Sequence, residues 1–303
     1  MATSRSKKKA AVADAVADLQ GALKGAGPHM GDIVWIEMSD VDVERDALRQ
    51  QFATAGLPAS LITPDPDAQS ALGRAVGRYR EAGRGIFLRR PQQRGKEVMI
   101  VQQRGETFDV LATVDVDGSQ LRVVRRADAN GQLESVVKEM EREFDHHLRY
   151  ARGSEVSHVM VTTILSWCGG IRLKENGHVY WVPAAGAQDL RATKGVADGL
   201  GDSHVTVIPV HATDESRAAL QRAATQSFEA ELRKANEELD AFAESEKDTR
   251  SSTLERRLAE FADLREKVEL YSDILERQKG RLLKGLEGAA ERCRGLIAGL
   301  EGE

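Results

Sequence analysis

The stretch Cys168-Gly169-Gly170-Ile171-Arg172-Leu173-Lys174-Glu175-Asn176-Gly177-His178-Val179-Tyr180-Trp181-Val182-Pro183 predicts two short strands joined by a tight turn. Gly169 and Gly170 permit positive φ values, so they are expected to end the apolar helix that precedes them. Pro183 is expected to end the second strand, because proline cannot donate a ladder hydrogen bond. Downstream of this hairpin the sequence becomes almost pure charged helix. The hairpin therefore closes the mixed part of the chain.

The composition of the 303-residue chain limits its class. The chain is 41% hydrophobic and 30% charged, which is enough apolar material for a sizeable core and about two domains. Its net charge of −5 excludes nucleic-acid binding by bulk electrostatics alone, so local patches must carry any such contact. No apolar run reaches the length of about 18 residues that a transmembrane helix needs, and no membrane contact is expected. Cys168 and Cys293 are far apart, which favours a reduced, cytoplasmic protein.

Residues 1–30 are expected to form a basic, alanine-rich arm. Lys7–Lys9 precede an amphipathic stretch whose apolar residues share one helix face: Val12, Val16, Leu19 and Leu23. We interpret the arm as a docking or partly disordered segment, with contact to nucleic acid as the alternative.

Residues 31–130 are expected to form an α+β domain. A β-branched and aromatic run predicts a strand at 33–38, and helical spacing of apolar residues predicts helices over 40–56 and 67–82. Four alternating segments separated by turn residues predict an antiparallel meander, with strands at 85–90, 97–101, 108–114 and 120–124.

Residues 131–212 are expected to form a module of helix, hairpin, helix and strand. The predicted helices span 131–150, 154–168 and 188–200. A strand at 205–210 is predicted to lie at a sheet edge because it contains Pro209.

Residues 213–303 are expected to form a long helical hairpin or coiled coil, so that the fold class is α+β with a helical C-terminal part. Apolar residues recur there every three or four positions. A stripe of this length favours self-association, and packing within one chain is the alternative. The candidate oligomerisation residues are Leu254, Leu258, Phe261, Leu264, Val268, Tyr271, Leu275, Leu282 and Leu286.

Motifs for catalysis are missing from the sequence. It contains no phosphate-binding loop, no dinucleotide-binding glycine motif and no nucleophile elbow. The densest set of metal-ligand types is Glu143, Asp145, His146 and His147, which we interpret as a solvated helix face because no second ligand pair stands at a recognisable spacing. Cys168 is interpreted as a buried structural thiol. We therefore expect no catalytic residue, no metal site and no cofactor.

A basic region is the stronger signal. Residues 74–104 hold nine basic residues against Glu81 and Glu97, a net charge of +7, and arginine suits phosphate contacts. The candidate nucleic-acid contacts here and on later strands are Arg78, Arg84, Arg89, Arg90, Arg94, Lys96, Arg122, Arg125, Arg126, Arg172 and Lys174. The alternative is a solvated face, or a contact with the acidic helices over 213–303, which have 21 acidic and 16 basic residues.

The central hairpin resembles an uncharacterised family found in phages, plasmids and other mobile elements. The resemblance rests on the run Leu165–Lys174 followed by Gly177–Pro183, and it covers roughly 140–290. Members carry a Gly-Gly-Val-Tyr-Phe-Val-Pro-like segment; here His178 replaces the second glycine and Trp181 the phenylalanine. The resemblance implies a mobile-element context and no particular activity.

Together these patterns predict a non-enzymatic structural or assembly protein that forms homo-oligomers and belongs to a mobile element. The alternative is a protein that binds DNA or RNA through the arginine-rich region over 74–126. In that case Arg172, Lys174 and His178 of the hairpin are further candidate contacts.

Overall fold

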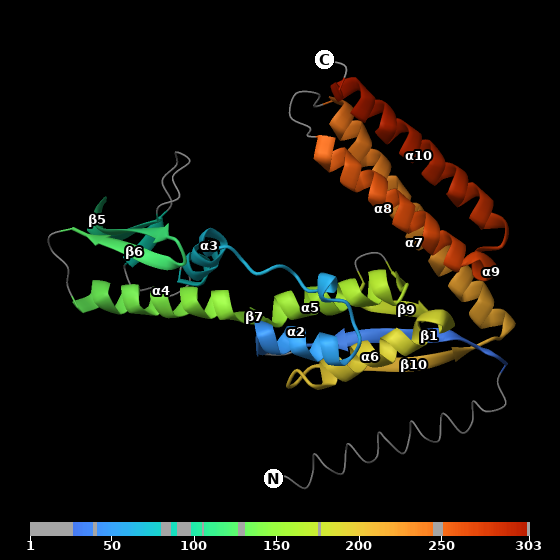
Figure 1. The fold of residues 1–303 in the computed structure, drawn as a ribbon, viewed down its shortest axis with the longest axis horizontal. Helices are drawn as coiled ribbons and strands as arrows, with labels where there is room; N and C mark the ends of the chain where they lie inside the picture. Colours follow the sequence, from blue (N-terminus) through green and yellow to red (C-terminus); the bar gives the residue numbers. More distant parts are fainter. Residues whose placement is uncertain are drawn as a thin grey trace, which may run out of the picture. The chain divides into compact units, whose positions relative to one another are not determined.

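The computed structural model describes residues 27–38, 41–79, 86–89, 98–104, 106–126, 131–174, 177–244 and 251–301. They form two compact units, each described by itself: unit 1 from Met1–Met38 and Met160–Glu303, and unit 2 from Ser39–Val159. Both units contain antiparallel sheets, and unit 1 ends in long helices (Figure 1). The predicted α+β class is confirmed.

Unit 1 is built on a four-stranded antiparallel sheet. Its central strand β1 (His29–Glu37) pairs with β10 (His204–His211) on one side and β9 (Val179–Pro183) on the other. The two-residue strand β8 (Ile171–Arg172) pairs with β9, so the predicted hairpin forms. β10 lies at the end of the strand order, which confirms the edge position predicted from Pro209.

Short helical segments connect the strands of this sheet. Helix α5 (Gly153–Thr162) continues into one π-helical turn, η2 (Thr163–Trp167), before the hairpin. After β9 the chain makes a 3₁₀ turn, η3 (Ala184–Gly186), and enters α6 (Ala187–Asp198), which packs against β10.

The C-terminal part of unit 1 is a bundle of three long helices. These are α7 (Asp214–Glu244), α8 (Ser251–Leu270) and α10 (Arg277–Glu301), and α10 runs along α8 and α7 (Figure 1). The short helix α9 (Ser272–Leu275) separates α8 from α10, and Glu276 then adopts a φ of 46°. The predicted helical hairpin therefore contains one break more than expected, at α9 between α8 and α10.

Unit 2 contains the predicted meander. Strands β3 (Ile86–Arg89), β4 (Val98–Arg104), β5 (Thr107–Asp117) and β6 (Gln120–Arg125) pair antiparallel in sequence order. A bulge between Ile100 and Val101 shifts the register of β4 on β5. The pairing of strands in sequence order, with β5 and β6 joined by a two-residue turn, explains why the alternating pattern predicted this sheet well.

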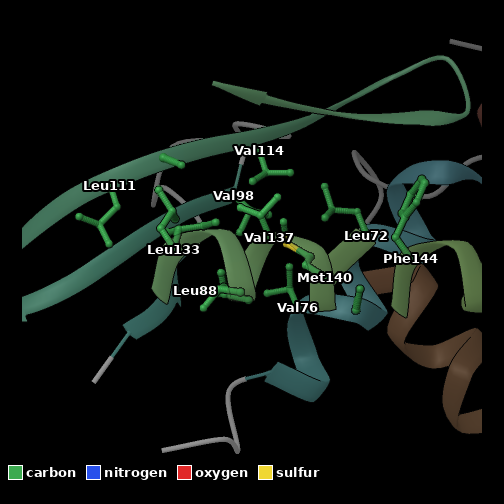
Figure 2. Close-up of a cluster of buried hydrophobic side chains, with 14 of the residues drawn as sticks. Leu72, Val76, Leu88, Val98, Leu111, Val114, Leu133, Val137, Met140 and Phe144 are labelled. Carbon is green, nitrogen blue, oxygen red and sulfur yellow. The ribbon is translucent and has the colours of Figure 1, made fainter. Parts of the chain in front are cut away.

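Helices α3 (Ala68–Tyr79) and α4 (Gly131–Arg149) pack with the meander. Figure 2 shows the resulting core, whose side chains include Leu72, Val76, Leu88, Val98, Val114, Val137, Met140 and Phe144. All of these side chains are almost completely buried, so the core of unit 2 comes from the apolar helix faces that the 3.6-residue period predicts.

A buried ion-pair cluster joins the remaining elements of unit 2. Strand β2 (Asp42–Glu44) pairs with β7 (Tyr150–Arg152), and helix α2 (Arg45–Thr54) follows directly, before the short turn η1 (Ala59–Leu61). The Arg45 guanidinium is 5% exposed and donates to Glu155 Oε2 at 2.9 Å; Arg74 Nη1 donates to Glu155 Oε1 at 2.6 Å. Two guanidinium groups thus share one largely buried carboxylate, whose side chain is 15% exposed.

The division into units differs from the predicted boundaries. The strand predicted to open a domain over 31–130 belongs to unit 1, because β1 pairs with β9 and β10. The helix predicted to open the 131–212 module belongs to unit 2, because the apolar face of α4 covers the meander. Both differences arise from pairings between segments far apart in sequence.

A candidate interaction groove beside the central hairpin

A glycine turn brings the central hairpin against helix α8. Gly169 has a φ of 66°, in the left-handed region that favours glycine. A Cβ atom at this position would lie 2.7 Å from Leu270 Cδ2, which is closer than real Cβ contacts. The turn after η2 therefore favours glycine for its backbone conformation, and a larger residue would also displace the end of the exposed Leu270 side chain.

Tyr271 fixes the same turn to the bundle. Its hydroxyl donates a hydrogen bond of 2.7 Å to the carbonyl oxygen of Gly169. The ring is 1% exposed and contacts Trp181 and Phe228 edge to face, at centroid distances of 5.2 and 5.3 Å. Burial raises the pKa of Tyr271 well above its usual value, so the hydroxyl stays protonated and remains a donor.

A groove of about 680 Å³ opens beside this anchor. Its walls come from four parts of unit 1: residues 165–169 around the glycine turn, the segment Ala185–Asp189, Glu231 of α7, and 260–270 of α8. The groove is therefore built from the elements that the hairpin draws together.

Large apolar side chains remain exposed at this groove. Trp167 is 45% exposed and Leu270 is 46% exposed. Leu264 of α8 also lines the groove. Tryptophan is strongly enriched among the residues that dominate protein interfaces. An exposed tryptophan at the wall of a groove points to binding of another polypeptide segment.

The groove is acidic. Five carboxylates line it, from Asp189, Glu231, Glu260, Asp263 and Glu266, and the one cation among its lining residues is Lys267. Asp263 and Glu266 are exposed, and neither has an ion-pair partner within the described part of the chain. Burial lowers the pKa of Lys267, while the nearby Glu231 carboxylate opposes that shift. The groove therefore suits a positively charged ligand segment.

Cys168 lies at the base of this region and is buried, as predicted. Its Sγ is 3.7 Å from Thr193 Oγ1, and burial raises its pKa to about 11. The thiol is therefore protonated at neutral pH and is a poor nucleophile.

A second groove of about 640 Å³ contains the predicted hairpin cations. Arg172 and Lys174 are both exposed there, and the Arg172 guanidinium lies 6.0 Å from the centre of the Tyr180 ring. Arg233 and Lys234 of α7 add positive charge, but three glutamates also line the groove: Glu229, Glu231 and Glu237. The surface is of mixed charge, in contrast to the acidic groove.

The arginine-rich candidates are only partly described. Arg84, Arg90, Arg94 and Lys96 lie outside the described residues, and the side chains of Arg78 in α3 and Arg89 in β3 do as well.

The remaining three of these candidates lie on or just after strand β6. Arg122 and Arg126 are exposed, whereas Arg125 is engaged by Glu134 at 2.7 Å. That ion pair raises the pKa of Arg125 and lowers the pKa of Glu134.

The candidate oligomerisation residues do not form an exposed stripe. Seven of the nine are almost completely buried within the bundle of one chain, and Leu258 and Leu264 are partly buried against it. The alternative, packing within one chain, accounts for this stripe. The third helix of the bundle covers the apolar surface that two helices would leave exposed. Any self-association must use another surface.

The two histidines of α4 lie in different environments in unit 2. His146 Nε2 lies 2.8 Å from Asp42 Oδ1, and the ring stacks on Tyr150 at a centroid distance of 4.6 Å. His147 is 7% exposed, its ring nitrogens have no hydrogen-bond partner among the described residues, and burial lowers its pKa. In the described part of the chain, no group of three or more histidine, cysteine or acidic side chains is placed to hold a metal ion.

The sequence did not reveal the groove, for one main reason. Trp167 belongs to the predicted apolar helix over 154–168, and helical periodicity alone does not mark it as exposed. The π-helical turn Thr163–Trp167 contains hydrogen bonds over five residues, which rotates the following side chains relative to an α-helical face. Trp167 is therefore exposed, and no pattern in the sequence marks such a turn in advance.

Comparison with known proteins gives one match. No curated protein and no solved structure matches the chain. No helix of the described segments is long and apolar enough to cross a membrane. The model of a family of unknown function, DUF6744, matches residues 29–301, from the first residue of β1 to the end of α10. The chain therefore belongs to DUF6744.

Proposed function

We propose that this chain is a non-enzymatic, self-associating assembly protein of the cytoplasm, in the mobile-element setting that the hairpin resemblance implies. The observation that carries the proposal is the exposure of Trp167 and Leu270 at a groove of about 680 Å³. Leaving two large apolar side chains in water at a concave surface is unfavourable, and a partner segment that covers them recovers that free energy.

The charge of the groove limits how two copies meet. If two grooves packed directly against each other, Asp263, Glu266 and Glu260 of one copy would face the same carboxylates of the other. Like charges that meet at an interface are strongly unfavourable. In the proposed contact, the acidic groove of one copy therefore does not meet the groove of the other. It takes a basic, apolar segment of the other copy.

Light scattering of the full chain tests this proposal. The wild-type protein is expected to shift from monomer to a larger assembly between about 1 and about 100 μM at low salt, and the shift weakens with salt. The variant Asp263→Lys/Glu266→Lys is expected to stay monomeric. Its matched control is Glu287→Lys/Glu291→Lys, which makes the same charge change on exposed residues of α10. A monomer at every concentration would refute the proposal.

Binding of nucleic acid is the second candidate, favoured by the exposure of Arg122 and Arg126 at strand β6. Phosphate contacts predict that affinity falls steeply as salt rises. Arg122→Gln/Arg126→Gln is expected to weaken binding of a DNA or RNA duplex, whereas Arg125→Gln changes it less, because Glu134 already engages Arg125. No binding at low salt would remove this candidate.

A further inference from the structure

We propose that the segment bound in the acidic groove is residues 1–26 of a second copy of this chain, so that two copies exchange their N-terminal arms. This inference rests on the proposed self-association and names the segment that performs it. Three observations support it: the charge of the arm, its apolar face, and the place where the described chain begins.

The charge of the arm complements the groove. Residues 1–26 contain five basic residues, Arg5, Lys7–Lys9 and Lys24, against Asp14 and Asp18, which gives a net charge of +3. The groove presents five carboxylates and one lysine. The lysines of Lys7–Lys9 match Asp263 and Glu266, two exposed groove carboxylates that have no ion-pair partner in the described structure.

The arm also offers an apolar surface of the right kind. The predicted helix over 10–24 has four apolar residues at spacings of four, three and four on one face: Val12, Val16, Leu19 and Leu23. The groove offers Trp167, Leu264 and Leu270. An amphipathic helix that lays its apolar face into a groove of this composition is a recurring mode of recognition.

The described chain begins at the same end of the sheet as the groove. The Gly27 carbonyl lies 2.9 Å from His211 Nδ1, so the start of β1 is held against the end of β10. On its other side β1 pairs Gly31 with Pro183, and the next residues, Ala184–Gly186, pack on β1 and lead into the groove wall. The chain therefore enters β1 at the end of the sheet at which β9 leads toward the groove wall.

The proposed exchange is reciprocal, so that each copy gives its arm to the groove of the other. Two copies placed groove to groove around a twofold axis bring each arm near the groove of its partner, and the exchanged arms then separate the two acidic surfaces. Such exchange closes the assembly at a dimer.

A charge-swap mixing experiment on the full chain tests the inference. The arm variant Lys7→Glu/Lys8→Glu/Lys9→Glu and the groove variant Asp263→Lys/Glu266→Lys are each expected to dimerise about tenfold or more weakly than wild type. Mixed in equal parts they are expected to form a heterodimer, because the basic arm of one meets the acidic groove of the other, and the acidic arm meets the basic groove. The control mixture pairs the arm variant with Glu287→Lys/Glu291→Lys, for which no rescue is expected.

Zero-length carbodiimide cross-linking shows which copy supplies the arm. In an equal mixture of natural and heavy-nitrogen-labelled wild-type chains, cross-links from Lys7–Lys9 to Asp263 or Glu266 are expected to include pairs of one light and one heavy peptide. Cross-links only within one label place the arm in its own groove and overturn the inference. If wild type dimerises but the arm variant dimerises equally well, the arm is not the bound segment, although the proposed self-association stands. If the wild-type protein is monomeric at every concentration, the proposed self-association is itself refuted.

Discussion

Removing the hydroxyl of Tyr271 tests how the hairpin is held to the helical bundle. The change Tyr271→Phe keeps the buried ring and its edge-to-face contacts with Trp181 and Phe228. It deletes one hydrogen bond, from the hydroxyl to the Gly169 carbonyl at 2.7 Å. The Gly169 carbonyl, in a partly buried position beside the groove, then loses its partner on the bundle.

The expected loss of stability follows from these contacts. A net intramolecular hydrogen bond contributes about 0.5–1.5 kcal/mol, and an acceptor left buried without a partner adds to the loss. We therefore expect Tyr271→Phe to lower the free energy of unfolding of unit 1 by about 1–2 kcal/mol. Truncation to Tyr271→Ala also removes the ring, so its loss is expected to reach about 3–5 kcal/mol.

Tryptophan fluorescence during urea unfolding measures this effect in the correct unit. All three tryptophans, Trp35, Trp167 and Trp181, belong to unit 1. The control is Tyr150→Phe, which alters a tyrosine of unit 2 and is expected to leave the tryptophan transition unchanged. If Tyr271→Phe shifts the transition no more than Tyr150→Phe does, the hydroxyl does not anchor the hairpin.

Three further predictions follow from the same geometry. Gly169→Ala is expected to destabilise unit 1 by about 1–3 kcal/mol in urea unfolding, because its φ of 66° is unfavourable for alanine and the end of the Leu270 side chain must move, whereas Gly195→Ala in α6, where the space around the new methyl group is open, is neutral or stabilising; equal effects would refute the role of the turn. Cys168, with its pKa raised to about 11, is expected to react with a thiol reagent at neutral pH only after denaturation, and rapid reaction of the native protein would contradict its burial. Burial holds the pKa of His147 below 6.5 in the folded protein, so the unfolded chain binds the proton more strongly; calorimetric stability is then full above about pH 6.5 and falls as the pH decreases toward the lowered pKa. His147→Asn should flatten that dependence and exposed His158→Asn should not; an unchanged profile in the His147 variant would contradict the assignment.

Local patterns in the sequence predicted most elements. The meander over Ile86–Arg125 was predictable because its strands alternate and its turns are short, so each strand pairs with its neighbour in sequence. The long C-terminal helices were predictable from the spacing of their apolar residues. The edge position of β10 followed from Pro209 alone.

Features that depend on distant contacts were not predictable. No local signal indicates that β1 pairs with β9 and β10, more than a hundred residues away, and this pairing moved the domain boundary. The spacing of apolar residues shows which face of a helix is apolar but not what that face packs against. It therefore left open whether the apolar stripe of residues 213–303 is covered by the same chain or by another. The groove depends on the π-helical turn before Cys168 and on the close approach of Gly169 to Leu270, and both are properties of the packed structure.

The central claim, that this chain associates with itself through the acidic groove, is tested most directly by sedimentation equilibrium of the full-length protein. One chain has a mass of 33.2 kDa. At low salt the mean mass is expected to rise with concentration toward twice that value, to fall back toward the monomer as salt increases, and to stay at the monomer value in Asp263→Lys/Glu266→Lys. A mass that stays at 33.2 kDa at every concentration, or an association that the groove substitutions leave unchanged, would contradict it.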